Sequence, residues 1–127
     1  MTPSEYQNPI LCADYSDPDI VRVGDDFFMV SSSFNHVPAL PILHSTDLVN
    51  WTIINHVMDE LPLPGYDRYQ PGKGVWAPSI RWHDGKLWVC FSTPDEGIFI
   101  CHTEDPWGEW SAPHCLREAR GWIDPCP

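Results

Sequence analysis

Three residues hold equivalent places in the chain, and two of them could carry acid–base chemistry. Asp17, Ala77 and Asp124 each stand directly before a proline. Two carboxylates that share one pocket can hydrolyse a bond together, because one can activate water while the other assists protonation of the leaving oxygen. An Asp-Pro pair also opens turns, in which the carboxylate accepts backbone N–H bonds. The pattern by itself leaves both interpretations open.

Aromatic residues near these positions indicate what such a pocket would bind. Trp76 directly precedes Ala77, and Phe34 ends the strand-like run that begins after Asp17. Sugars stack their C–H faces on rings and bond polar groups through their hydroxyls, and paired carboxylates are what glycosidic bond cleavage needs. His36 lies in the same loop and could bond a sugar hydroxyl, although a single loop histidine is also compatible with plain exposure to solvent. We predict a carbohydrate site, with packing of the rings in the core as the alternative.

The elements that must position these residues are pairs of strands. Alternating apolar and polar residues bounded by Gly and Asp predict two hairpins, with strands at 19–23 and 27–33, and at 79–82 and 87–93. Each hairpin is followed by a third apolar segment, at 41–47 or 98–105, which leads through an acidic turn to a tryptophan. The second half of the chain therefore repeats the first.

The spacing of the repeat predicts blades of a β-propeller. Pro18 and Pro78, like Trp51 and Trp110, are separated by about 60 residues, and a four-stranded unit of that size must stack on neighbours around an axis to cover its apolar faces. Tandem hairpins in a sandwich are the alternative, but they do not explain the shared tryptophans. The expected blades lie at about 17–58 and about 76–117, and a third begins at about 122.

The number of blades bears on how the domain is completed. Propellers close with about four to eight blades, so two blades and the start of a third indicate the N-terminal part of a single propeller domain in a longer protein. A ring assembled from several copies of this chain is the alternative, and the oligomeric state is left open. In a closed ring the innermost strands run along the axis, which would bring Asp17 and Asp124 to one mouth of the channel.

The charge and hydropathy of the chain limit the classes of partner that it could bind. The 127 residues contain 7 Lys and Arg against 18 Asp and Glu, a formal net charge of −11, which argues against nucleic acid as a partner. No apolar run approaches the roughly 20 residues of a membrane span, so we expect no membrane partner. The first residues lack the basic and apolar stretches of a secretory signal. We therefore expect a cytoplasmic protein, or a periplasmic or secreted one if the natural N-terminus has been trimmed.

Cysteine and histidine usage gives no indication of a metal. The cysteines form no C-x-x-C pair and the six histidines are scattered singly, which is unlike a zinc site. Cys90 and Cys101 fall inside apolar strand-like runs and are expected to be buried free thiols. We predict no metal site and no required cofactor; a cation in the channel cannot be read from the sequence.

Several segments resemble glycoside hydrolase family 43. They are NPI at 8–10, DPDIVRVGDDFFMVSSSF at 17–34, LHSTDLVNW at 43–51, GVWAPSIRWHDGK at 74–86 and WIDP at 122–125. The resemblance spans nearly the whole chain. It implies a five-bladed β-propeller that hydrolyses glycosidic bonds with inversion and removes terminal xylose or arabinose from oligosaccharides of plant polysaccharides such as xylan.

The resemblance also implies roles for single residues. Asp17 matches the general base that deprotonates the attacking water. Asp124 matches the family's third carboxylate, which orients the general acid and raises the pKa of that acid through like-charge proximity. Phe34 and Trp76 match positions that line the pocket for the terminal sugar.

Two departures from the family pattern limit the functional prediction. The family's general acid is a glutamate well downstream of the third-blade aspartate, so the isolated chain is expected to be inactive, and an inactive fragment or a non-catalytic sugar-binding propeller is the alternative function. After Phe34 the chain reads NHVPA at 35–39, where xylosidase-like members often carry aromatics, and this favours α-L-arabinofuranosidase relative to β-xylosidase. Four glutamates in or near turns of the second repeat match no family motif: Glu96, Glu104, Glu109 and Glu118.

The link between the two repeats, 59–73, is rich in proline and glycine and shows no strand pattern. We expect a surface connection held by its prolines. Contact of Tyr66, Tyr69 or Lys73 with the leaving sugar is the alternative.

Overall fold

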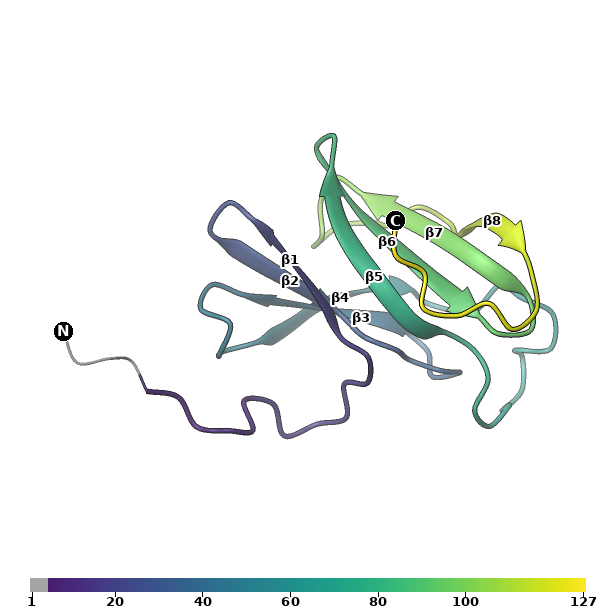
Figure 1. The fold of residues 1–127 in the computed structure, drawn as a ribbon, viewed down its shortest axis with the longest axis horizontal. Coiled ribbons are helices and arrows are strands. Elements are labelled where there is room, and N and C mark those ends of the chain that lie inside the picture. Colours follow the sequence, from purple (N-terminus) through teal and green to yellow (C-terminus); the bar gives the residue numbers. More distant parts are fainter. Residues whose placement is uncertain (1–4) are drawn as a thin grey trace.

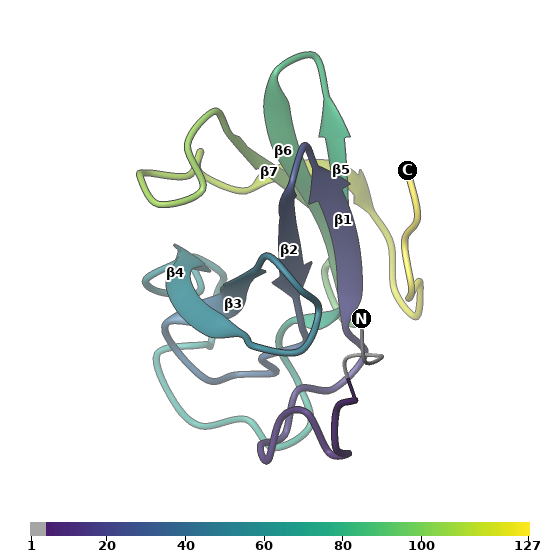
Figure 2. The same ribbon diagram turned by 90° about the vertical axis from the view of Figure 1, so that its left-hand side faces the viewer.

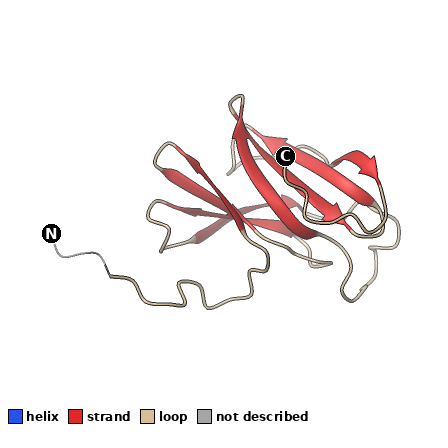
Figure 3. Ribbon diagram, viewed as in Figure 1, coloured by secondary structure: helices blue, strands red, loops and turns tan. Residues whose placement is uncertain are grey.

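Two four-stranded antiparallel sheets make up the computed structural model, which describes residues 5–127 and contains no helix within them (Figures 1 and 3). The strands are β1 (Asp19–Val23), β2 (Asp26–Val30), β3 (Ala39–Ser45), β4 (Thr52–Met58), β5 (Trp76–His83), β6 (Lys86–Thr93), β7 (Gly97–Thr103) and β8 (His114–Glu118). The prediction of an all-β chain with two repeating units is confirmed, and the sheet orders are β1-β2-β3-β4 and β5-β6-β7-β8. The predicted blade limits of 17–58 and 76–117 compare with strands that span 19–58 and 76–118.

The first two strands of each sheet meet in a two-residue turn, which is shorter than the sequence predicts. Gly24-Asp25 joins β1 to β2, and Asp84-Gly85 joins β5 to β6. The φ angles of Gly24, Asp84 and Gly85 are 63°, 49° and 73°. This left-handed backbone closes a tight hairpin, and Gly and Asp adopt it at low cost. The residues on either side therefore pair in the strands rather than forming the turn.

Strand β2 ends at Val30, three residues before the predicted end of the strand at 33. The N–H of Ser32 donates to the carbonyl of Ser16 (2.9 Å), and the N–H of Ser33 donates to the carbonyl of Val75 (3.3 Å). The three serines at 31–33 are buried. The chain leaves the sheet here because the backbone N–H groups of Ser32 and Ser33 bond to the segments that precede β1 and β5.

The core lies between the two sheets. Val30 and Ile42 from the first sheet and Ile80, Val89 and Phe91 from the second belong to one cluster in which each of these side chains is at most 1% exposed. Burying a large aliphatic or aromatic side chain contributes about 1.5–3 kcal/mol. The shared cluster therefore holds the two sheets against each other, whereas β8 is exposed along its whole length.

The edge strands β1 and β5 lie side by side and run in the same direction (Figure 2). Because each sheet is antiparallel, the segments that enter β1 and β5 and the segments that follow β2 and β6 share one end of the molecule. We call this the mouth end; it includes 16–17, 31–36 and 74–77. The turns after β1, β3, β5 and β7 form the opposite, hairpin end, which includes 24–25, 46–51, 84–85 and 104–108.

The link between the two sheets, 59–73, carries no strand. Polar side chains, and not only its prolines, hold it on the second sheet. Lys73 forms an ion pair with Asp95 (Nζ–Oδ2 2.7 Å). The hydroxyl of Tyr66 donates to Glu96 (3.3 Å) and accepts the N–H of Gly74 (3.2 Å). Burial, with the nearby Glu96 carboxylate, raises the pKa of the Tyr66 phenol. The predicted surface connection is present, and Tyr66 and Lys73 are what anchor it.

The prediction that Cys90 and Cys101 are buried free thiols is confirmed. Cys90 and Cys101 are buried and free, and burial raises the pKa of Cys101 to about 12, so that thiol stays protonated at neutral pH. Residues 5–127 hold no helix that is long and apolar enough to cross a membrane. Among the same residues, no three His, Cys, Asp or Glu side chains are grouped as a metal site would require.

Candidate active site

The three residues that precede the aligned prolines share an unusual backbone conformation. Asp17, Ala77 and Asp124 have φ angles of 49°, 31° and 56°. Residues with a β-carbon seldom adopt positive φ; Asp tolerates it better than Ala. The same turn therefore leads into the innermost strand of each sheet and recurs at Asp124. The three positions that the sequence aligns therefore also share a positive backbone φ angle.

Only one of the two carboxylate oxygens of Asp17 accepts hydrogen bonds from the described residues. Its Oδ2 accepts hydrogen bonds from the hydroxyls of Ser16 (2.7 Å) and Ser32 (2.9 Å). The Ser32 Oγ in turn accepts the N–H of Ala77 (2.8 Å). The carboxylate of the first sheet is thereby linked to the first strand of the second. Within residues 5–127, no side chain or backbone group donates a hydrogen bond to Oδ1, which leaves that oxygen free for a water molecule.

The two candidate aromatic residues come from chain segments that pair directly. Phe34 forms an antiparallel bridge with Val75, the neighbour of Trp76, through two backbone hydrogen bonds of 2.9 and 2.7 Å. Gly74 makes this pairing possible: its φ is 97°, and a β-carbon there would overlap the carbonyl oxygen of Phe34. The Trp76 indole donates to the carbonyl of Gly72 (3.1 Å). Both rings are half-buried at the mouth end.

Arg81 ties together the segments that follow the two candidate aspartates. Its guanidinium bonds to Asp19 Oδ2 (2.6 Å), two residues after Asp17, and to the Sγ of Cys126 (2.9 Å), two residues after Asp124. The N–H of Ile80 donates to the same Asp19 oxygen (2.9 Å). The hydrogen bond that Arg81 donates to Asp19 raises the pKa of its guanidinium. Asp124 itself is exposed, and its side chain makes no hydrogen bond within the described part of the chain.

His36 is placed differently from the other candidates. Its backbone N–H donates to the carbonyl of Ser33 (2.9 Å), which closes a turn after Phe34. The residue is exposed, and no hydrogen bond of its ring to any of residues 5–127 is present. The turn places it at the mouth end near Phe34, without tying the imidazole to Asp17.

The sequence did not single out three residues that contact or support the candidate site: Ser32, Asp19 and Arg81. The signal for Ser32 was present in the Ser31-Ser32-Ser33 run, three small polar residues at the end of an apolar strand pattern. For Asp19 and Arg81 there was no local signal, because their contact joins positions 62 residues apart.

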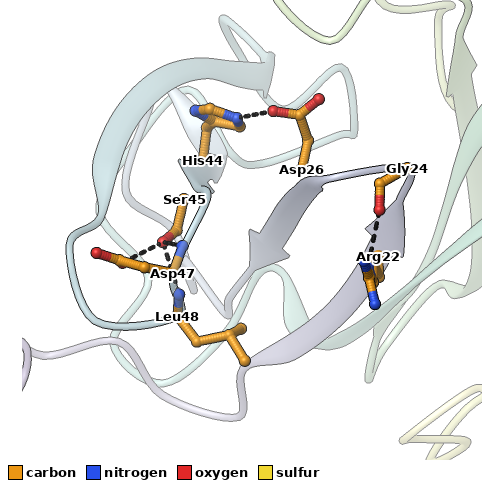
Figure 4. A network of polar contacts seen from close by, with 7 residues as sticks. All are labelled: Arg22, Gly24, Asp26, His44, Ser45, Asp47 and Leu48. Atoms are coloured by element: carbon orange, nitrogen blue, oxygen red, sulfur yellow. Dashed lines mark hydrogen bonds and ion pairs between the residues drawn. The ribbon is translucent and has the colours of Figure 1, made fainter. Parts of the chain in front are cut away.

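A second polar network lies at the hairpin end of the first sheet, away from these residues (Figure 4). His44 bonds to Asp26 (Nε2–Oδ1 2.6 Å). Asp47 accepts the backbone N–H and the side-chain amide of Asn50, and these bonds hold the pKa of Asp47 well below its usual range. The glutamates Glu104 and Glu109 also fall near this end. The His44–Asp26 bond joins β3 to β2 and the Asp47 bonds close the turn after β3, so this network supports the first sheet.

The fold and the mouth-end geometry define the chain first as part of a β-propeller. The sequence profile described as "Glycosyl hydrolases family 43" matches residues 6–127. The chain belongs to this family, and its two sheets correspond to blades of the family's five-bladed β-propeller.

Individual relatives agree with this assignment. The chain is 41% identical over 123 residues to a xylosidase/arabinosidase of Butyrivibrio fibrisolvens, with 93% of this chain and 23% of the relative covered. It is 38% identical over 127 residues to the non-reducing end alpha-L-arabinofuranosidase BoGH43B of Bacteroides ovatus, with 94% and 23% covered. The GH43 protein BlXynB of Bacillus licheniformis superimposes with a TM-score of 0.84 at 32% identity, with 94% of this chain and 26% of that chain covered. The chain thus spans about a quarter of the length of these proteins.

Proposed function

We propose that the full-length protein to which this chain contributes is an inverting exo-glycosidase that releases terminal xylose or arabinose from oligosaccharides of plant polysaccharides. The single observation that carries the proposal is the arrangement of Asp17, whose Oδ2 accepts two hydroxyl donors while Oδ1 is left open. A general base needs a fixed carboxylate with one oxygen free to receive a proton from water. Membership of family 43 supplies the class of substrate.

In the proposed reaction, Asp17 Oδ1 takes a proton from a water molecule as the water oxygen attacks the anomeric carbon. The glycosidic bond on the opposite face breaks, and its oxygen takes a proton from a general acid. Because bond formation and bond breaking occur on opposite faces, the product sugar has the inverted configuration. In this proposal the general acid is a glutamate elsewhere in the full-length protein, as the resemblance to family 43 implies, and without it the isolated chain is not expected to turn over substrate.

The other candidates take supporting roles in this proposal. Asp124 would face the general acid, orient it and favour its protonated form through like-charge repulsion. Phe34 and Trp76 would stack on the terminal sugar, and His36 would bond one of its hydroxyls. The reaction moves two protons and a glycosyl group and changes no oxidation state, so it requires no redox cofactor. Whether a cation occupies the channel is a separate matter, which metal analysis of the purified protein answers.

The test is hydrolysis by the full-length protein of p-nitrophenyl β-D-xylopyranoside and p-nitrophenyl α-L-arabinofuranoside. Proton NMR of the first-formed sugar reads its anomeric configuration before mutarotation. We expect release of a pentose of inverted configuration, and the ratio of kcat/KM on the two substrates identifies the preferred sugar. Binding of xylo-oligosaccharides without hydrolysis would replace the enzyme with a sugar-binding propeller. A product of retained configuration would overturn the role of Asp17 as a general base.

A further inference from the structure

The three serines at 31–33 are consecutive and buried, but their hydroxyls have different surroundings. Within residues 5–127, the Ser31 Oγ has no hydrogen-bond partner. The Ser33 Oγ accepts the N–H of Leu40 (3.1 Å), a contact inside the first sheet. Only the Ser32 Oγ joins the two sheets, because it lies between the Asp17 carboxylate (2.9 Å) and the Ala77 N–H (2.8 Å).

The directions of these two hydrogen bonds follow from the groups involved. A backbone N–H can only donate, so the Ser32 oxygen accepts the N–H of Ala77. The hydroxyl proton of Ser32 is then free to donate to the Asp17 carboxylate, which as an anion only accepts. The Ser32 hydroxyl thus accepts one hydrogen bond, from Ala77, and donates one, to Asp17. These two bonds fix its orientation.

We propose that Ser32 is a positioning residue: its hydroxyl sets the orientation of the Asp17 carboxylate from the backbone of the second blade, so that the base is aligned only where the two blades pack. This inference rests on the proposed function, since it assigns Asp17 as the base. It also explains why Ala77, the counterpart of Asp17, keeps positive φ without carrying a carboxylate (φ 31°). In that conformation its N–H donates to Ser32.

Removal of the Ser32 hydroxyl has two consequences. The Ala77 N–H loses its acceptor, and the Asp17 carboxylate keeps only the donor from its half-buried neighbour Ser16. The base can then rotate away from the position in which its free oxygen meets the water. Misplacement of a reacting group by about 1 Å can lower a rate about 10²-fold. Since Ser32 itself is buried (7% exposed), binding of the sugar should change little.

The experiment compares Ser32→Ala, Ser31→Ala and Ser33→Ala in the full-length protein, with kcat and KM on the better p-nitrophenyl pentoside and with thermal unfolding. We expect kcat of Ser32→Ala to fall about 10²-fold with KM nearly unchanged. Ser32→Thr, which keeps the hydroxyl, should recover most of kcat. Ser31→Ala should leave both constants unchanged, and Ser33→Ala should lower the unfolding temperature without a comparable loss of kcat.

A thermal-unfolding cycle with Ser32→Ala, Asp17→Ala and the double variant tests the contact independently of activity. Linked side chains give a double variant whose Tm loss differs from the sum of the single losses. Additive losses, or a Ser32→Ala variant with normal kcat, would overturn the role of Ser32. If Ser32→Ala does not fold, Ser32→Cys with its weaker donor should give an intermediate kcat, and normal turnover by that variant would count against the proposal. An unsubstituted protein that hydrolyses neither pentoside would overturn the proposed function instead, and the cycle would still decide whether Ser32 holds Asp17.

Discussion

In the 45–50 turn at the hairpin end of the first sheet, polar side chains bond within a few residues of themselves, whereas beside the candidate site they join segments far apart in the sequence. Asp47 accepts hydrogen bonds from Ser45, Val49 and Asn50, all within three residues of it. At the mouth end, Ser32 reaches a residue 45 positions away. Asp19 reaches one 62 positions away. The 45–50 turn thus stabilises the first sheet alone, whereas Ser32 and Asp19 connect the two sheets beside the candidate site. The sheets are also joined at the hairpin end, where Asn55 Nδ2 donates to the carbonyls of Pro106 (3.1 Å) and Gly108 (2.6 Å).

This contrast indicates where substitutions should matter. Substitution of a side chain whose partners are all near it in the sequence should destabilise only the turn that it closes. A side chain that spans the two sheets affects both the seam and the orientation of Asp17. A change to a side chain that spans the sheets should therefore have a larger effect than a matched change to one whose partners are local.

The largest difference is expected between two aspartates of the first blade. In the full-length protein, Asp17→Ala should lower kcat by about 10²–10⁴-fold, because it removes the proposed base and little packing. Asp25→Ala removes a fully exposed carboxylate at the hairpin end and should leave kcat unchanged. Steady-state hydrolysis of the pentoside and circular dichroism of both variants provide the comparison. Normal turnover by a folded Asp17→Ala variant would end the assignment of Asp17 as the base.

The next difference concerns two glycines with positive φ. At Gly74 an added β-carbon would overlap the Phe34 carbonyl, while at Gly24 it would meet nothing within 4 Å. We expect Gly74→Ala to lower the free energy of unfolding by about 3 kcal/mol or more, since crowding adds to the left-handed strain. Gly24→Ala carries the strain alone, about 1–2 kcal/mol. Denaturant unfolding measures both, and equal losses would show that the Phe34–Val75 bridge does not constrain residue 74.

A smaller difference separates two acidic partners of arginines. Asp19 receives the Arg81 guanidinium at 2.6 Å and the N–H of Ile80 at 2.9 Å. Asp19→Ala should cost about 1–3 kcal/mol, largely because a backbone donor loses its acceptor. The ion pair of Arg22 with Asp25 spans 3.6 Å and is fully exposed on the Asp25 side, so Asp25→Ala should barely change stability. Thermal unfolding of the two variants should therefore give clearly different Tm values; similar values would contradict a structural role for Asp19 between the sheets.

The smallest effect is a pH dependence at the hairpin end. Hydrogen bonds from Asn50 hold the pKa of Asp47 below its ordinary value of 3.8. A lowered pKa in the folded state means that the ionised form stabilises the fold above about pH 4 and that this stability is lost as the pH falls below that value. The Tm difference between the unsubstituted protein and Asp47→Ala should therefore be largest near neutral pH and should narrow in acid. A difference that stays constant down to about pH 2 would argue against the Asp47 turn.

Much of the fold could be predicted because its determinants are local. Alternation of apolar residues, Gly and Asp at the turns and the repeated tryptophans indicated two four-stranded units, and motifs placed the chain in family 43. Errors occurred where non-local bonds compete with a local pattern. The 31–33 serines continue the β-prone run of β2, yet their backbone bonds go to Ser16 and Val75, so the strand ends at Val30.

The sequence by itself determined the repeat, the residue types at the equivalent positions 17, 77 and 124, and the buried thiols, since periodicity and composition act along the chain. Only the tertiary structure decided which groups hold Asp17, that Ala77 serves the site through its N–H, and that Arg81 links the segments after both aspartates. The physical reason is the separation along the sequence of the groups that interact. A turn is fixed by the φ preferences of neighbouring residues, whereas a hydrogen bond between sheets forms only after the shared apolar core has brought distant segments within about 3 Å.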